Sequence, residues 1–139
     1  MKIVHITDYF NEKVAYQENM LTLGQLELGH DVSVLTSDLL IEIADTKNNR
    51  IRPIGTSVHE GIKIIRTAHT IELKKNSLLH YRSVLKNLLK INPDYIFIHD
   101  KGLYIFSILF YKIFFKKKFI IRMDFHSDFT NSMNSKFGK

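Results

Sequence analysis

The chain contains no cysteine, which excludes a disulfide scaffold, a thiolate metal site and a cysteine nucleophile. Its N-terminus, MKIVHITDYF, has a short apolar run but no small-residue cleavage site, so it predicts a first β-strand and not a signal peptide. The aromatic-rich segment 101–115, KGLYIFSILFYKIFF, is too short and too interrupted for a bilayer span. These absences favour a cytoplasmic protein.

Glycine-rich phosphate loops are also absent. The segment after the first predicted strand reads TDYFNEKVAYQEN and contains neither G-x-G-x-x-G nor G-x-x-x-x-G-K. In proteins with those motifs, backbone N–H groups beside the glycines hold the phosphates of a nucleotide. The sequence therefore argues against a nucleotide bound in the manner of Rossmann dehydrogenases or of P-loop proteins.

The composition is that of an ordinary globular domain with a basic balance. Of the 139 residues, 45% are hydrophobic and 24% are charged, which is enough apolar material for a core. The net charge is +6 and the isoelectric point is about 9.5, which favours anionic partners such as nucleic acid, acidic lipid or phosphorylated substrates. The basic residues are dispersed and no recognition motif accompanies them, so we expect no nucleic-acid partner.

Apolar patterning predicts strands that alternate with helices along the chain. Short β-rich runs predict strands at residues 2–6, 31–38, 61–67, 95–99 and 119–123. Helical spacing predicts helices at residues 14–28, 77–90 and 101–115, the first of them stopped by Gly29 and the last closed by the lysines 116–118. Residues 39–53 are expected to form an excursion between elements.

This order predicts an α/β fold, a Rossmann-like three-layer domain with a mostly parallel sheet. Strand–helix–strand units cross over right-handed into parallel sheets, and the very apolar strands suit a sheet covered on both faces. No repeat, low-complexity tract or linker divides the sequence, so residues 1–139 are expected to form one domain.

Polar side chains follow several of these strands at the point where each strand ends. In open α/β sheets, ligands bind beyond the carboxyl ends of the strands, which would bring these residues to one edge. Each aspartate alone is better explained by solvation or helix capping, whereas the whole set indicates a site. It consists of Thr7, Asp8, Tyr9, Phe10, Thr36, Ser37, Asp38, His99, Asp100, Asp124, His126 and Asp128.

His126 is the strongest single candidate, because a histidine can exchange a proton near neutrality or orient a phosphate. Asp124, His126 and Asp128 alternate, so on an extended chain they would share one side and could hold a divalent ion. The aromatic turns of residues 101–115, beside the lysines 116–118, could instead contact an anionic membrane surface, although a buried crossover helix is the simpler interpretation.

Several segments together resemble the N-terminal domain of a family 4 glycosyltransferase with the GT-B fold. Ala15-Tyr16-Gln17-Glu18 stands where members often carry G-Y-Q-E, and Gly29-His30-Asp31-Val32 stands where they carry G-H-E-V. The segments HEGIKIIR at 59–66, NPDYIFIH at 92–99 and DFHSDF at 124–129 resemble further motifs of the family, in the same order along the chain. The resemblance covers nearly the whole chain.

The resemblance implies an acceptor-side domain whose partner domain binds a nucleotide-sugar. By position, His126 would contact the transferred sugar as the catalytic residue, and Tyr16, Gln17 and Glu18 would meet acceptor and diphosphate. His99, Asp100, Asp124 and Asp128 complete the expected substrate-binding set. Family members typically need no metal, so no metal or other cofactor is expected, and the nucleotide-sugar would be a substrate of the full-length enzyme.

The expected function is the N-terminal part of an enzyme of polysaccharide biosynthesis, which moves a hexose from a nucleotide-sugar to a glycan or lipid-linked acceptor. The donor-binding domain is not in this sequence, so we expect a truncated or partial enzyme that is inactive alone. Its partner would be the missing C-terminal domain or a second subunit. The alternative is a non-catalytic module that binds a partner or a membrane, or one half of a split enzyme. The expected location is the cytoplasm, in peripheral contact with the inner face of the membrane.

Overall fold

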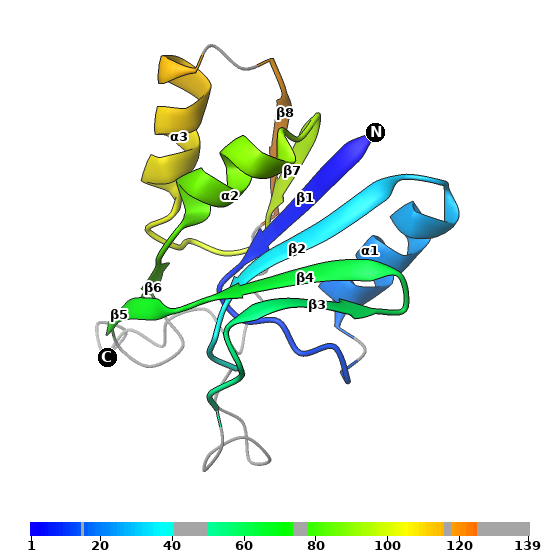
Figure 1. Cartoon of the computed structure of the whole chain (residues 1–139), viewed down its shortest axis with the longest axis horizontal. Coiled ribbons are helices and arrows are strands. Elements are labelled where there is room, and N and C mark those ends of the chain that lie inside the picture. The colour runs from blue at the N-terminus through cyan, green and yellow to red at the C-terminus, as the bar shows by residue number, and fades with distance from the viewer. Residues whose placement is uncertain (15, 41–49, 74–77, 116–117, 125–139) are drawn as a thin grey trace, which may run out of the picture.

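The computed structural model describes residues 1–14, 16–40, 50–73, 78–115 and 118–124. Strands and helices alternate at the start and at the end of this part of the chain, as the apolar patterning predicts, whereas five strands between residues 31 and 81 follow one another with no helix among the described residues (Figure 1). The helices are α1 (Gln17–Glu27), α2 (Val84–Ile91) and α3 (Ile105–Phe114). The strands are β1 (Lys2–Thr7), β2 (Asp31–Ser37), β3 (Gly55–His59), β4 (Ile62–Thr67), β5 (His69–Leu73), β6 (Leu78–Tyr81), β7 (Tyr95–Ile98) and β8 (Ile120–Met123).

Six of the strands form one sheet in the order β3-β4-β2-β1-β7-β8. All neighbours in it run parallel except β3, which pairs antiparallel with β4 at one edge. β1 lies at the centre, where Ile3 is opposite Val32 on one side and Tyr95 on the other. β5 and β6 form a separate antiparallel hairpin. The predicted α/β class with a mostly parallel sheet is therefore confirmed.

Helices cover both faces of the sheet. Side chains alternate along each strand, so every strand presents residues to both helix layers. Val4 and Ile6 of β1 belong to a core cluster with residues of α2 and α3, including Leu88 and Ile108. On the other face, alternate residues of β2 and β4 form a smaller cluster with Phe10, against which Leu23 and Leu26 of α1 pack. The result is a three-layer arrangement.

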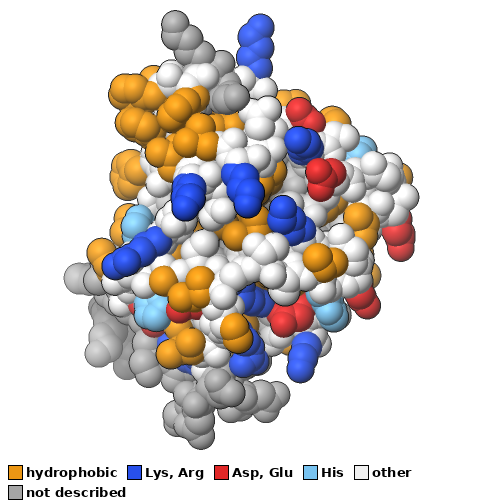
Figure 2. Space-filling model, viewed as in Figure 1, with side chains coloured by type: hydrophobic (Ala, Val, Ile, Leu, Met, Phe, Trp, Pro, Cys, Tyr) orange, Lys and Arg blue, Asp and Glu red, His pale blue; other side chains and the backbone are white. Residues whose placement is uncertain are grey.

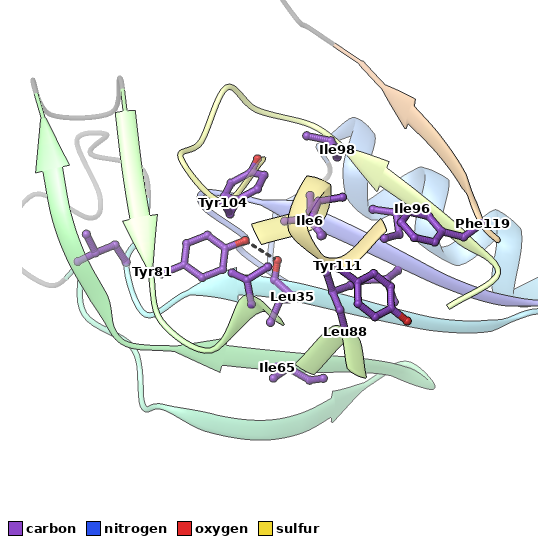
Figure 3. Packing of buried hydrophobic residues seen from close by; sticks show 14 residues of the cluster. Ile6, Leu35, Ile65, Tyr81, Leu88, Ile96, Ile98, Tyr104, Tyr111 and Phe119 are labelled. Carbon is purple, nitrogen blue, oxygen red and sulfur yellow. Dashed lines mark hydrogen bonds between the residues drawn. The ribbon is translucent and has the colours of Figure 1, made fainter. Parts of the chain in front are cut away.

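Buried tyrosines fill the core between the sheet and the α2–α3 layer (Figure 3). Tyr81, Tyr104 and Tyr111 are all fully buried. Tyr81 directs its hydroxyl at the backbone and donates to the carbonyl oxygens of Leu35 at 3.2 Å and Thr7 at 3.4 Å. Burial raises the pKa of Tyr81, with Asp8 and Asp100 adding to the effect, so the hydroxyl stays a donor.

Left-handed backbone conformations mark the ends of two helices. Gly29 follows α1 with a φ of 79°, as the sequence predicts, and its N–H donates to the carbonyl of Leu26. Asn92 follows α2 with a φ of 51°. Asparagine tolerates this conformation better than most residues do, so it can stop a helix where glycine is absent.

The prediction of one helix over residues 77–90 is wrong in its first half. Residues 78–81 form strand β6, which pairs with β5, and the helix begins only at Val84. Ser83 before it is left-handed, with a φ of 63°, which prevents the helix from extending toward the N-terminus. Helices were also predicted too long at residues 14–28 and 101–115, and strands β3 and β5 were not predicted.

Candidate functional site at the carboxyl edge of the sheet

Asp100, directly beyond β7, connects the ends of two parallel strands. Its Oδ2 accepts hydrogen bonds from the Thr7 hydroxyl at 2.6 Å and from the Asp8 backbone N–H at 2.7 Å. Thr7 ends β1, so the first polar residues after two neighbouring strands meet as the sequence predicts. Asp100 remains partly exposed, whereas Asp8 is buried behind it.

A second carboxylate lies at the same edge, after β2. Oδ1 of Asp38 accepts from both the backbone N–H and the ring Nδ1 of His69, each at 2.8 Å. Because an ionised carboxylate only accepts, the bond places a proton on Nδ1, and in the neutral ring Nε2 is then a proton acceptor. The His69 side chain is 35% exposed, so this oriented histidine is accessible.

The hairpin β5–β6 is attached to the loop after β1 by a charged cluster. Arg50 makes two hydrogen bonds to the Glu72 carboxylate, at 2.7 and 3.3 Å, and the Tyr9 hydroxyl donates to Glu72 at 3.0 Å. Arg50 also lies 5.9 Å from the centre of the Tyr9 ring. Burial, followed by the Glu72 hydrogen bond, raises the pKa of Tyr9, which therefore stays protonated. The cluster forms one wall of the site.

Arg66, at the end of β4, anchors the loop after β1 in the same region. Its Nη2 donates to the backbone carbonyl of Phe10 at 2.9 Å and to the Glu12 carboxylate at 2.5 Å. The guanidinium is almost fully buried, and this burial lowers the pKa of Arg66 while Glu12 opposes the shift. Because arginine titrates far above neutrality, the pair remains ionised and fixes the loop.

Beneath the edge lies a buried pair of histidines. His5 Nδ1 is 2.8 Å from His99 Nε2, and His5 Nε2 is 2.7 Å from Gln25 Oε1. The His5 ring also stacks on Phe97, with ring centres 4.9 Å apart. Burial lowers the pKa of His5 to about 4, with the Gln25 bond opposing and His99 adding to the shift. Both rings are therefore part of the interior and support the site from below.

The structure brings together only part of the predicted substrate-binding set. Asp100 lies at the centre of the site and His99 lies under it, 3% exposed. Tyr16 is the N-cap residue of α1 and is exposed, and Gln17 and Glu18 form the first turn of that helix. Asp124 follows β8, where its N–H donates to the carbonyl of Ile98. His126 and Asp128 lie outside the described residues.

Sequence reasoning placed Tyr9 at this edge but missed His69 and Glu72. Both reach the site through the hairpin β5–β6, which has no periodic pattern. The only local signal was the position of Ala68-His69-Thr70 directly after a predicted strand, where a polar residue falls at the functional edge.

A separate cavity of about 180 Å³ opens between α1, the loop after β1 and the β3–β4 hairpin. Apolar side chains of Phe10, Leu23, Ile62 and Ile64 are part of its lining. Asn19 also lines it, and its Oδ1 is buried without a hydrogen-bond partner among the described residues. This cavity is not part of the carboxylate edge, since neither Asp100 nor Asp38 lines it.

Within the described ranges, no group of three or more histidine, aspartate or glutamate side chains is arranged to hold a metal ion. The set Asp124, His126 and Asp128 extends beyond these ranges. No helix in the part of the chain that the structure describes is long and apolar enough to cross a membrane.

Comparison with known proteins identified no relative. The chain matches no protein-family model, no curated protein and no solved structure.

Proposed function

We propose that this chain is the acceptor-side, N-terminal part of a GT-B glycosyltransferase of family 4. The observation that carries the proposal is the edge formed by Asp100, Asp38 and His69 at the carboxyl ends of parallel strands. Carboxylate oxygens accept hydrogen bonds from the hydroxyl groups of a sugar. Two segments resemble those of the family: Tyr16, Gln17 and Glu18 of AYQE lie at the start of α1, and GHDV runs from Gly29 into the first two residues of β2.

The charge of this edge favours an acceptor over a phosphorylated donor. Asp8, Asp38 and Asp100 are gathered there, whereas Arg50 and Arg66 are each paired with a glutamate. A diphosphate would meet mainly like charge, while a neutral glycan would not. His69, oriented by Asp38, is suited to accept the proton of an attacking hydroxyl.

In the proposed reaction an acceptor hydroxyl forms the new bond to the anomeric carbon of a hexose, and the nucleoside diphosphate leaves with the bonding electron pair. His126 would orient the transferred sugar, and Tyr16, Gln17 and Glu18 would contribute to the cleft. The donor would be held by a second domain or subunit. We therefore expect this chain alone to bind acceptor and not to transfer sugar.

A titration followed by nuclear magnetic resonance tests the acceptor site in this 16.3 kDa chain. Neutral hexose oligosaccharides should shift the amide signals around Asp100 and His69, and uridine diphosphate should not. Asp100→Asn should weaken oligosaccharide binding by about tenfold, because it removes a charged hydrogen-bond acceptor. Asp94→Asn is the matched control, since Asp94 caps the start of β1 through Lys2 N at the opposite edge. Binding of uridine diphosphate in preference to sugar would overturn the proposal.

The role of His126 needs the donor side. When the chain is assayed together with the domain or subunit that supplies the donor site, His126→Ala should lower turnover by two orders of magnitude or more, since an electrostatic contact to the reacting sugar is lost. Unchanged turnover would remove His126 from the site and leave the acceptor edge as a separate proposal.

A second candidate function is a non-catalytic binding module, or one half of a split glycosyltransferase. The observation in its favour is the outward face of α3, where five large apolar side chains are exposed. In this proposal the chain acts through what it docks to, in peripheral contact with the inner face of the membrane or with a second subunit. A chain that binds no oligosaccharide at Asp100 but still docks through α3 would favour this function.

A further inference from the structure

The net positive charge of this protein arises in one part of the chain. Residues 82–123 contain nine lysines and arginines against two aspartates, a net charge of +7. The remaining residues contain eleven basic and twelve acidic side chains, a net charge of −1. The whole positive balance therefore belongs to the segment that forms α2, β7, α3 and β8, and neither of the two helices contains an acidic residue.

The outer face of α3 is apolar and uncovered by any described residue. Five exposed side chains recur at intervals of three and one residues, so they lie along one side of the helix. They are Phe106 (68% exposed), Leu109 (45%), Phe110 (42%), Ile113 (67%) and Phe114 (66%). The rings of Phe110 and Phe114 stack with centres 4.1 Å apart. We call these five residues the α3 ridge.

The opposite side of α3 already provides the contacts that hold the helix in the fold. Tyr104, just before the helix, and Ile108 and Tyr111 within it are fully buried in the core cluster. The α3 ridge is thus additional apolar surface, beyond what the core requires. A monomer seldom leaves a contiguous apolar patch of large side chains exposed unless the patch binds something.

Cations border the α3 ridge. α2 packs beside α3 and exposes Arg82, just before it, together with Lys86 and Lys90. Lys112, within α3, and Lys118, after it, are also exposed and lie next to the ridge in sequence. Figure 2 shows apolar side chains gathered over α3, with Lys and Arg side chains beside them over α2, on one face of the molecule.

We propose that the α3 ridge and the α2 cations form a docking surface for a lipid bilayer that carries anionic headgroups. The ridge enters the boundary between headgroups and acyl chains while the helix lies in the plane of the membrane. The lysine and arginine side chains contact the negative headgroups, where each cation near the surface strengthens binding about fivefold. Anionic headgroups fit better than the same face of a second copy of the chain, because neither α2 nor α3 has an acidic residue to oppose these cations.

This inference does not rest on the proposed glycosyl transfer. The docking surface lies on the helices, whereas the acceptor edge lies at the carboxyl ends of the strands, so each can fail without the other. A variant at Asp100 should lose oligosaccharide binding and keep vesicle binding. A variant in the α3 ridge should do the reverse.

Vesicle flotation of the full chain tests the proposal. The chain should float with vesicles made of equal parts of phosphatidylcholine and phosphatidylglycerol, and remain in solution with phosphatidylcholine alone. Raising the salt concentration should weaken the binding, because screening acts on the cations and not on the ridge. Equal binding to both vesicle types would overturn the anionic requirement.

Substitutions then separate the two parts of the surface. Phe106→Ser with Ile113→Ser should abolish flotation, and Lys86→Gln with Lys90→Gln should weaken it about 25-fold. All four side chains are exposed, so the fold should persist, which circular dichroism checks. Leu28→Ser with Val58→Ser is the matched control, because these apolar residues are similarly exposed, just after α1 and on β3, and these elements lie away from α3.

The sequence contains no tryptophan, so a single introduced one reports on its own surroundings. Phe106→Trp should show a blue shift of its fluorescence when the anionic vesicles are added, and Leu28→Trp should not. If neither shifts, and the ridge variants instead dissociate a dimer in sedimentation experiments, the surface binds a second copy of the chain and the membrane proposal is overturned.

Discussion

The two faces of the central sheet differ in what they bury. Toward α2 and α3, fourteen buried apolar residues form one cluster, including three fully buried tyrosines. Toward α1, the described apolar cluster has five members, and the rest of the buried surface includes His5, His99 and Gln25. The buried residues of α1 itself are Thr22 and Gln25, both polar.

The two faces therefore contribute to stability in different ways. One contributes free energy that is independent of pH, and the other makes the free energy of unfolding depend on pH. The α2–α3 face gains free energy from apolar burial, which does not change with pH. The α1 face includes the buried ring of His5, which bonds to His99 and Gln25, and its burial disfavours a positive charge there. The polar edge with Asp100 lies at the strand ends, which belong to both faces. Apolar packing supports this edge on the α2–α3 side, and buried polar groups support it on the α1 side.

The largest expected effect comes from the apolar face. Leu88 is fully buried in the α2–α3 cluster, and Leu88→Ala should lower the free energy of unfolding by about 2–5 kcal/mol. Leu23→Ala on α1 should cost about 1 kcal/mol, because Leu23 is only partly buried against its cluster. Urea denaturation of both variants measures the difference. Equal losses would contradict the division between the two faces.

Much of this architecture follows from local patterns in the sequence. The five predicted strands correspond to β1, β2, β4, β7 and β8. The first four are largely buried, and buried parallel strands are continuous apolar runs. β8 has an apolar run too, although it lies at the edge of the sheet and is mostly exposed. β3 was missed because all five of its residues are exposed at the edge of the sheet and it has no apolar pattern. β5 and β6 pair only with each other, and Leu78 and Leu79 fit a helix as well as a strand.

The candidate site could be predicted at the level of strands but not of side chains. Placing Thr7, Asp8 and Asp100 at one edge needs only the direction of the strands. The bond from His69 to Asp38 depends on a hairpin that leaves the sheet, for which the sequence has no periodic signal. His99 was expected to face a substrate, whereas its ring lies beside that of His5, because the residue that follows β7 still alternates with the strand.

The histidine pair gives the α1 face a dependence on pH. Burial lowers the pKa of His5 to about 4, whereas the unfolded chain binds this proton with a pKa of 6.5. The unfolded state therefore takes up the proton first as the pH falls. The contribution of neutral His5 is complete above pH 6.5 and is lost as the pH falls through 4, a loss of about 3 kcal/mol.

Thermal unfolding between pH 7 and pH 4 measures this effect against a variant. His5→Phe keeps a ring to stack on Phe97 but removes the titrating group, so the variant should be less stable at pH 7 and lose less stability on acidification. His59→Gln on the exposed strand β3 serves as the control and should follow the unmodified chain. Parallel curves for His5→Phe and the unmodified chain would place the pH dependence elsewhere.

A smaller effect concerns the point where both faces meet the polar edge. A Cβ built on Gly102 would collide with the Tyr104 ring of the apolar face and with Oδ1 of Asp8 at the edge. Gly102→Ala should therefore lower the free energy of unfolding by about 1–3 kcal/mol, because neither neighbour has room to move. Gly24→Ala in α1 is the matched control: its Cβ would meet nothing within 4 Å, and the helix should gain about 0.5–1 kcal/mol.

The affinity of Gly102→Ala for oligosaccharide tests whether the strain reaches the polar edge. A shift of Asp8 would also move its backbone N–H, which donates to Asp100. If Gly102→Ala lowers the free energy of unfolding but leaves oligosaccharide binding unchanged, only the Tyr104 ring has moved. The geometry of the polar edge would then not depend on the packing of the core beneath it.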